Sequence, residues 1–476
     1  MSQWLAIREL AEQVQAGKSS ALELVEQSLR TIEEKSEFNA IIATLDDTAR
    51  ARARRIDERI ANGEKIGRLA GVPFIAKDNF LVFGTETTAA SNILKGFNAP
   101  YQATAIEKLE AEGAICVAKA NLDAFAHGSS TENSDFGPTK NPHDPTRVPG
   151  GSSGGSGAAV VLDLAPFALG TDTGGSIRLP ASFCGAVGYK PTYGLVSRSG
   201  VVAMASSLDT IGPLTRSVED AALVIDVMAG RDPLDSTTIE RDDESYTDFS
   251  DVQLKGAKIG VIKEYFGEGL SDSVRSTIDA SIEKLKAAGA EIVEVSLPSL
   301  PLALAVYYVV CPAEVSSNLS RYDGQRYGYT NADATNLDES FSGSREIGFG
   351  TEAKRRIMIG TYVLSSGYYD AYYNKAQTVR TKLINEFTAA FESVDFLLGP
   401  TAPTTAFKLG QNIDDPLAMY LIDIMTVAAN LVGVPAISIP AGFAEGMPVG
   451  LQLLAAQRHD RELFALAHAA EEAVRE

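Results

Sequence analysis

The sequence is poor in the residues that bind transition metals or form disulfides. It contains only three cysteines and four histidines in 476 residues. Cys116, Cys184 and Cys311 are odd in number, far apart and set in apolar or Gly/Pro-containing segments, which favours reduced thiols in the core over a disulfide framework. No Cys or His has the spacing of zinc ligands, so we expect no metal site.

Long apolar runs and positive charge are also scarce. We expect no apolar run to reach the roughly 20 residues needed to cross a bilayer, and the N-terminus mixes Arg8, Glu9, Glu12 and Lys18 with apolar positions, unlike a signal peptide. We therefore expect a cytoplasmic protein without membrane association. The formal net charge of −20 repels polyphosphate at long range, so nucleic acid would have to be bound mainly by a partner.

The overall composition is that of an ordinary globular protein. Apolar residues make up 45% and charged residues 22% of the chain, which excludes a disordered or fibrous protein. Short apolar runs typical of buried strands alternate with helical patterns, and this alternation predicts an α/β fold. The strand-like runs lie at 115–118, 259–262 and 396–398, and helical stripes lie at 278–285, ended by Gly289, and at 462–474.

The N-terminal part is expected to be helical, because Ser20 and Glu23 have the spacing of a capping box at the start of an apolar stripe. Two polar segments without periodicity, 232–251 and 330–350, are predicted to be irregular surface excursions. There is no internal repeat, so we expect one domain over 1–476. Its predicted parts are N-terminal helices at about 1–65, a Ser/Gly-rich core at about 66–230 and a helical excursion at about 231–390.

Two Gly/Ser-rich runs are the most informative feature of the chain. They read GGSSGGSG at 150–157 and GGSIR at 174–178. Glycine lets backbone N–H groups converge on one point and serine supplies hydroxyls, so two such loops can form an oxyanion site around a nucleophile. The alternative is a flexible linker, but the stretch between the runs is apolar, as in buried structure.

A serine nucleophile needs a base, and the sequence offers two kinds. The first run matches G-x-S-x-G, the nucleophile elbow of an α/β-hydrolase, which would require His459 or His468 downstream. Neither histidine has the setting of a catalytic base. Lys77 instead follows the strand-like run 71–76, where burial would keep its amine neutral and able to accept a proton from serine. Taken alone, Lys77 also fits an exposed lysine at a strand end.

Three motifs together resemble the amidase signature family in order and spacing: GVPFIAKD at 71–78, GGSSGGS at 150–156 and GTDTGGSIR at 170–178. The resemblance implies an amidase-signature α/β fold, a large mixed central β-sheet flanked by α-helices on both faces. It implies a Ser-Ser-Lys triad in which Lys77 is the base, Ser152 the bridging serine with a cis peptide, and Ser176 the nucleophile. The implied oxyanion hole consists of the backbone amides of Thr173, Gly174, Gly175 and Ser176.

The same motif contains two charged residues that we interpret as structural. Asp172 and Arg178 are better explained as buried supports that hold the loop than as catalytic groups. A Lys–Ser–Ser relay can take a proton from one serine and return it through the other, so amide hydrolysis requires no histidine.

The resemblance extends over nearly the whole chain, through 318–324, 354–357 and 365–373, to the A subunits of bacterial glutamyl-tRNA(Gln)/aspartyl-tRNA(Asn) amidotransferases. It implies a glutaminase that passes ammonia to a B subunit, which amidates Glu-tRNA(Gln) or Asp-tRNA(Asn), in a heterotrimer completed by a C subunit. It implies no cofactor in this chain. ATP and Mg²⁺ would be used at the partner subunit, which would also make most of the contact with aminoacyl-tRNA.

A glutaminase must bind the two charges of a free amino acid. In the resembled subunits these contacts fall at Arg356 for the α-carboxylate and Asp423 for the α-ammonium, with Tyr307 beside the substrate. Arginine forms a bidentate fork on a carboxylate, and aspartate pairs with an ammonium group. The alternatives are a stand-alone amidase acting on another small amide and a structural subunit whose active site has decayed; Lys77 and the two serines argue against decay.

The chain departs from these subunits at DAFAHGSS, 123–130, where they commonly have Asp-Glu-Phe-Ala-Met-Gly-Ser-Ser. Ala124 replaces the Glu and His127 the Met, near the substrate pocket and the ammonia exit that the resemblance implies. We expect changed pocket polarity or coupling to the partner. His127 itself is expected to be a structural residue with satisfied hydrogen bonds. Leu195 and Ser199 replace a usual Arg and an aromatic, with no consequence that the sequence explains.

Overall fold

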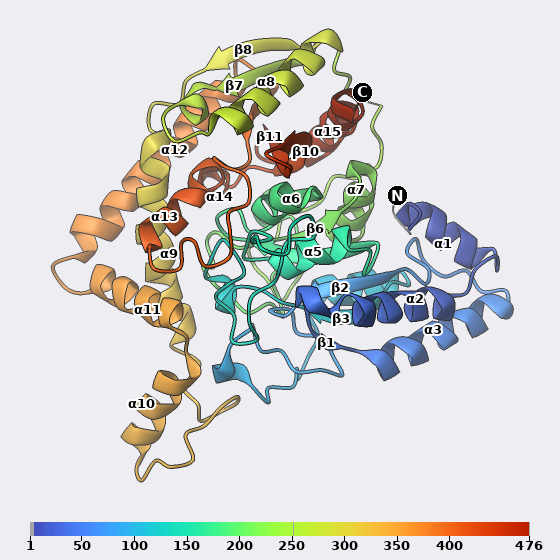
Figure 1. Cartoon of the computed structure of the whole chain (residues 1–476), viewed down its shortest axis with the longest axis vertical. Coiled ribbons are helices and arrows are strands. Elements are labelled where there is room, and N and C mark those ends of the chain that lie inside the picture. The colour runs from blue at the N-terminus through green and yellow to red at the C-terminus, as the bar shows by residue number, and fades with distance from the viewer. Residues whose placement is uncertain (1–3, 251, 476) are drawn as a thin grey trace.

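One mixed β-sheet of eleven strands runs through the part of the chain that the computed structural model describes, residues 4–250 and 252–475 (Figure 1). The strands lie in the order β1 (Ile41–Thr44), β3 (Ile115–Ala120), β2 (Pro73–Lys77), β4 (Phe167–Asp172), β6 (Thr210–Thr215), β5 (Val187–Lys190), β10 (Ala436–Ala444), β11 (Met447–Ala455), β9 (Phe396–Pro400), β7 (Lys258–Ile262) and β8 (Glu291–Val295). Parallel and antiparallel pairs both occur. The α/β prediction and the three strand-like runs are confirmed.

Strands β3, β2 and β4 are mutually parallel, so their carboxyl ends meet at one edge. They are connected through α4 (Thr104–Ala111) and α5 (Gly154–Val161). The connection from β2 to β3 runs in one direction along the sheet, and the connection from β3 to β4 runs in the other. Because connections between parallel strands are right-handed, α4 and α5 lie on opposite faces of the sheet. The carboxyl edge between such helices is where α/β proteins commonly bind ligands.

Helices cover both faces, as predicted. On the face of the sheet that carries α4, α7 contacts α4 and α15, and α15 contacts α8. On the other face, α6 packs beside α5. Apart from α9 to α12, which are described below, the helices outside the crossovers are α1 (Ile7–Gln15), α2 (Ala21–Glu34), α3 (Asp46–Ala61), α6 (Arg178–Cys184), α7 (Val218–Met228), α8 (Asp272–Ala287), α13 (Pro416–Leu421), α14 (Val427–Val432) and α15 (Asp460–Arg475). Short helical turns are η1 (Ser36–Phe38), η2 (Asn92–Leu94), η3 (Ala124–Ala126), η4 (Lys263–Phe266), η5 (Leu300–Leu302) and η7 (Ile422–Met425).

A helical arm extends along one side of the sheet, in yellow and orange at the left of Figure 1. It contains α9 (Ala303–Leu319), α10 (Leu337–Gly348), α11 (Thr351–Leu364), the π-helical turn η6 (Asp370–Asn374) and α12 (Lys375–Phe391). The prediction that 330–350 is irregular is wrong, because α10 lies within it. Asn336 caps α10 by accepting from the N–H of Glu339 at 2.9 Å, but only Ser344 and Gly348 of the helix are buried, so no apolar stripe marks it in the sequence.

The expectation that no segment is long and apolar enough to cross a membrane is also wrong in part. Residues Leu300–Leu319 meet that test by length and composition, and half of this segment is buried. Its apolarity has a local explanation, because α9 packs against α11, α12 and α14 inside the protein. A core helix of this kind passes the same test as a spanning helix.

Several local predictions are confirmed. Ser20 and Glu23 form the capping box that opens α2, and Gly289 follows α8 with a φ of 101°. The three cysteines are free and buried. Residues 232–250 contain no helix or strand of the described chain. Strand β1 lies in the N-terminal part that was expected to be helical, and the single-domain organisation stays a prediction.

Candidate active site

The three motifs meet at the carboxyl edge of the parallel strands. Lys77 is the last residue of β2 and is completely buried. Its Nζ donates to Ser152 Oγ at 2.8 Å, to Ser153 Oγ at 2.9 Å and to Thr171 Oγ1, near the end of β4, at 2.9 Å. The lysine therefore has hydroxyl partners from both Gly/Ser motifs and no carboxylate in hydrogen-bond contact among the described residues.

This environment changes the charge of the lysine. Burial lowers the pKa of Lys77 to about 7, against the opposing effect of Asp123, Asp172 and Asp209. A neutral amine donates two hydrogen bonds and accepts one, so one of the three hydroxyls can donate to Nζ. The site thus holds a base that is available near neutral pH.

The serines differ in burial. Ser152 follows a cis peptide bond from Gly151, as the resemblance implied, and is completely buried, whereas Ser176 is 9% exposed. The N–H of Ser153 donates to the carbonyl of Ser176 at 3.1 Å, which joins the two serine loops. Ser176 Oγ makes no hydrogen bond within the described residues. It is the one hydroxyl of the predicted triad with some access to solvent.

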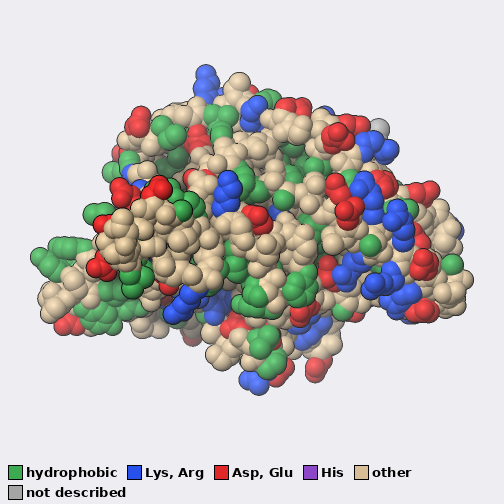
Figure 2. Space-filling view, turned by 90° about the horizontal axis from the view of Figure 1, so that it is seen from below, with side chains coloured by type: hydrophobic (Ala, Val, Ile, Leu, Met, Phe, Trp, Pro, Cys, Tyr) green, Lys and Arg blue, Asp and Glu red, His purple; other side chains and the backbone are tan. Residues whose placement is uncertain are grey.

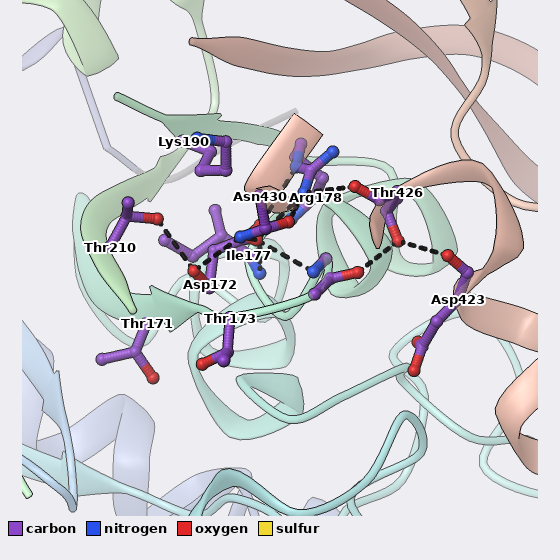
Figure 3. Close-up of polar contacts among 12 residues, drawn as sticks. Thr171, Asp172, Thr173, Ile177, Arg178, Lys190, Thr210, Asp423, Thr426 and Asn430 are labelled. Atoms are coloured by element: carbon purple, nitrogen blue, oxygen red, sulfur yellow. Dashed lines mark hydrogen bonds and ion pairs between the residues drawn. The ribbon is translucent and has the colours of Figure 1, made fainter. Parts of the chain in front are cut away.

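Asp172 and Arg178 form a buried clamp behind the nucleophile loop, as Figure 3 shows. Arg178 Nη2 lies 3.0 Å from Asp172 Oδ1 and Nε lies 3.1 Å from Oδ2, and both side chains are sealed from solvent. Burial alone would raise the pKa of Asp172, but Arg178 and its other partners hold it at about 2. This ion pair bears out their interpretation as structural supports.

The C-terminal part of the chain completes the clamp. Arg178 also donates to Gln452 Oε1 at 2.5 Å, Asn430 Oδ1 at 2.7 Å and the Thr426 carbonyl at 3.1 Å. Thr426 Oγ1 in turn donates to the carbonyl of Gly174 at 2.6 Å and, at 3.1 Å, to that of Asp423 (Figure 3). The nucleophile loop and the residue predicted to bind the ammonium group are therefore tied through one threonine.

The backbone of the loop has donors to offer an oxyanion. Thr173, Gly174 and Ser176 have N–H groups without a hydrogen-bond partner in the described chain, but the N–H of Gly175 donates to Asp172 Oδ1 at 2.9 Å. The oxyanion hole of four backbone amides stays a prediction. For Gly175, it would require the N–H group to donate to the oxyanion as well as to Asp172. At Gly174 an added Cβ would lie 2.7 Å from the Tyr307 ring, so only glycine allows this close approach.

The predicted amino-acid site is a pair of opposite charges on a tyrosine platform. The guanidinium carbon of Arg356 lies 5.5 Å from the Tyr308 ring centroid and 5.6 Å from that of Tyr420, and Nε donates to Glu352 Oε1 at 2.8 Å. Burial opposes the charge, but Tyr308 and Glu352 hold the pKa of Arg356 above its usual value. Among the described residues only Nε donates a hydrogen bond, which leaves the other four N–H groups for a ligand.

Asp423 lies at the other side of this platform. Its Oδ1 accepts from Ser129 Oγ at 2.7 Å and its Oδ2 from the Tyr308 hydroxyl at 3.0 Å. Burial raises the pKa of Asp423 to about 6, so the carboxylate is charged at pH 7 with no cation of the described chain in hydrogen-bond contact. Such a group favours a bound ammonium.

Several residues of the site were not predicted. They are Ser129, Ser153, Thr171, Tyr308 and Glu352. The G-x-S-x-G match included Ser153, and Tyr308 stands next to the predicted Tyr307, so the sequence contained a weak signal for two of them. Nothing local marks the others.

The prediction of a satisfied His127 is wrong. The side chain is completely buried, and neither ring nitrogen has a hydrogen-bond partner among the described residues. The alternative bases are not supported either. Within the described residues, His459 Nδ1 has a hydrogen-bond contact only with the Gln457 carbonyl, and His468, which belongs to α15, stacks on Phe249. No group of three or more potential metal ligands occurs in the described chain.

The arrangement of a buried lysine, two serines and Gly-rich loops on a mixed sheet is that of an amidase, and comparison with known proteins agrees. A family profile described as Amidase matches residues 23–464, so the chain belongs to the amidase family. It is 52% identical over 470 residues to the A subunit of glutamyl-tRNA(Gln) amidotransferase from Thermoanaerobacter pseudethanolicus, covering 98% of this chain and 96% of that one.

Solved structures show the same relationship. The chain is similar to the A subunit of glutamyl-tRNA(Gln) amidotransferase from Thermotoga maritima, with a TM-score of 0.80 and 42% identity over 95% of this chain and 91% of that one. It is also similar to the peptide amidase of Stenotrophomonas maltophilia, with a TM-score of 0.84 and 29% identity over 99% and 97% of the two chains. These relatives comprise both a component of a tRNA-dependent enzyme and an amidase that acts on peptides.

Proposed function

We propose that this chain is the glutamine-hydrolysing A subunit of a tRNA-dependent amidotransferase. The observation that carries the proposal is that buried Arg356 and Asp423 both contact Tyr308. Asp423 is also linked to the nucleophile loop through Thr426. Arg356 matches the α-carboxylate and Asp423 the α-ammonium of an amino acid. A simple aliphatic amide would leave the buried Asp423 carboxylate without a cation and four N–H groups of Arg356 without an acceptor, which is costly.

The proposed chemistry combines the contact of Lys77 with Ser152 and the Ser152-to-Ser176 relay that the amidase resemblance implies. Neutral Lys77 accepts the proton of Ser152 while Ser152 accepts that of Ser176, whose Oγ then attacks the side-chain amide carbon of glutamine. The resulting oxyanion is stabilised by the free N–H groups of the nucleophile loop. The proton returns through Ser152 to the departing nitrogen, so ammonia leaves. Water then attacks the acyl-enzyme and releases glutamate and Ser176.

The proposed partners are a B subunit that receives the ammonia and a C subunit, in a heterotrimer. ATP and Mg²⁺ would be used at the B subunit, which would also hold the aminoacyl-tRNA. In support, hydrophobic side chains gather at the left end of the molecule in Figure 2, the side of the helical arm in Figure 1. The exposed apolar residues of this arm include Leu337, Phe341, Ile347, Met358, Ile359, Tyr362, Leu364, Tyr368, Tyr369 and Tyr372. Such a patch is typical of a protein interface.

The proposal is tested by measuring ammonia release from glutamine and amidation of Glu-tRNA(Gln) and Asp-tRNA(Asn) by the chain purified with its partners. We expect the purified complex to release ammonia from glutamine. We expect amidated tRNA only when all subunits are present. The matched control is asparagine, which keeps both α-charges but is one methylene shorter. Faster hydrolysis of simple aliphatic amides, with no partner co-purifying, would favour a stand-alone amidase instead.

A further inference from the structure

His127 lies in the wall of the cavity that leads to the amino-acid site. The cavity has a volume of about 590 Å³ and is also lined by Arg356, Ser129, Asp123 and Tyr420. Ser129 donates to Asp423, so the cavity is lined by one charged residue of the proposed substrate site, Arg356, and by the hydrogen-bond partner of the other. His127 follows the turn η3 and has no exposed surface.

The backbone of His127 is anchored on both sides. Its N–H donates to the Ala124 carbonyl at 3.0 Å, and its carbonyl accepts from Asn133 Nδ2 at 2.9 Å. The two ring nitrogens, in contrast, are buried without any hydrogen-bond partner among the described residues. Buried polar atoms in folded proteins nearly always have a partner in the protein, in water or in a ligand. The imidazole is therefore a fixed polar group that lacks its partner.

The charge around the ring indicates the chemistry of that partner. Burial and the nearby Arg356 guanidinium lower the pKa of His127 well below its usual value, so the ring is neutral at pH 7. A neutral imidazole has one N–H donor and one acceptor nitrogen. Arg356 offers no acceptor to that N–H, but an anion bound to Arg356 does.

We propose that His127 is a specificity-determining residue that donates a hydrogen bond to the substrate carboxylate held by Arg356. This inference rests on the proposed function, because that function identifies the anion as the α-carboxylate of glutamine. The Arg356 guanidinium supplies the charge, and the imidazole N–H adds a second, directional contact. The residue sets affinity for the carboxylate end and takes no part in proton transfer at Ser176.

The test compares glutamine with 4-aminobutanamide, which is glutamine without its α-carboxylate. Calorimetric binding to the full chain in a Ser176→Ala background avoids turnover. His127→Met removes the ring N–H and restores the residue that related subunits commonly have, and His127→Gln keeps an N–H donor. We expect His127→Met to weaken glutamine binding about 10-fold or more and to leave 4-aminobutanamide binding unchanged, with partial recovery in His127→Gln.

A second readout separates a binding role from a structural one. Without ligand, His127→Met is expected to melt at or above the temperature of the parent protein, because it removes two unpaired buried nitrogens. Unchanged glutamine affinity in His127→Met, or equal weakening of both ligands, would overturn the inference while leaving the proposed function intact. A parent protein that binds neither ligand would refute the proposed function, and with it this inference.

Discussion

The catalytic centre and the substrate-recognition wall of this protein are built in different ways. Around Lys77 and Asp172, buried polar groups have partners within the protein, from hydroxyls to the Arg178 clamp. The substrate-recognition wall consists of Arg356, Asp423 and His127. Each of these side chains can form further hydrogen bonds that it does not form within the protein. In the first region the side chains that hold the loops are paired within the protein, whereas in the second the side chains that face the substrate are completed by a ligand. Substitutions should therefore affect turnover in the first region and affinity in the second.

The largest effect is expected from Ser176→Ala, which removes the proposed nucleophile. Glutamine hydrolysis should fall about 10⁴-fold or more, because the covalent route is lost and only binding and the oxyanion site remain. The melting temperature should stay close to that of the parent protein, because Ser176 Oγ makes no hydrogen bond within the described chain. Ammonia release and thermal melting measure the two quantities. A well-folded variant with substantial activity would show that another residue is the nucleophile.

Lys77→Arg should be nearly as damaging as Lys77→Ala. Arginine keeps the positive charge but does not lose its proton in proteins, so it cannot act as the base. We expect a loss in kcat of about 10³-fold or more, measured by ammonia release. Lys190→Met is the matched control, because Lys190 is also fully buried with its pKa lowered to about 7, yet among the described residues its Nζ donates a hydrogen bond only to the Pro191 carbonyl. Wild-type turnover in Lys77→Arg would contradict the neutral-lysine mechanism.

The pH dependence should reveal one group from each region. The pKa of Lys77 is lowered to about 7, and the amine must be neutral, so activity is present above pH 7 and falls below it. The pKa of Asp423 is raised to about 6, and the carboxylate must be charged, so its contribution is lost below pH 6. We expect kcat/KM to fall about tenfold per pH unit below 7 and more steeply below 6. A profile that is flat from pH 8 to 5.5 would exclude both assignments.

Asp423→Asn should break the recognition wall while leaving the catalytic centre intact. We expect kcat/KM for glutamine to fall about 30- to 1000-fold, because the α-ammonium loses its buried carboxylate. Glutaramic acid, which lacks the α-amino group, should lose much less. Comparing the two substrates under the same conditions measures the difference. Equal losses would mean that Asp423 is a structural charge and would favour a general amidase.

Tyr308→Phe should have the smallest effect and should sharpen the comparison. Its hydroxyl donates to Asp423 and lowers the pKa of that carboxyl, so its removal should raise the pKa further. Activity on glutamine should drop about 5-fold at pH 7 and recover at pH 8. Tyr420→Phe is the control, since its hydroxyl donates to Glu352 at 2.8 Å. An identical loss at both pH values would assign Tyr308 to packing alone.

The two regions also differ in how well the sequence predicts them. Ser152 and Ser176 belong to two runs whose glycines and serines are unusual enough to be recognised. Lys77 follows a strand-like run that gained its meaning from the order and spacing of the three motifs, and the parallel strands β2 and β4 bring two of these motifs to one edge. Arg356 and Asp423 carry no local signal and were identified through family resemblance. Ser129 and Glu352 were missed, because their roles depend on contacts with Asp423 and Arg356 across the fold. Helix α10 was missed since it buries almost no apolar surface.

The Arg178 clamp has a consequence for how the enzyme matures. The cation and its carboxylate lie in the first half of the chain, but three of the acceptors that satisfy the guanidinium come from Thr426, Asn430 and Gln452. A nascent chain that has not yet released this segment from the ribosome lacks three of the acceptors to which Arg178 donates in the complete protein. We therefore expect glutamine hydrolysis to begin only after this C-terminal segment has been synthesised and has folded against the catalytic motifs.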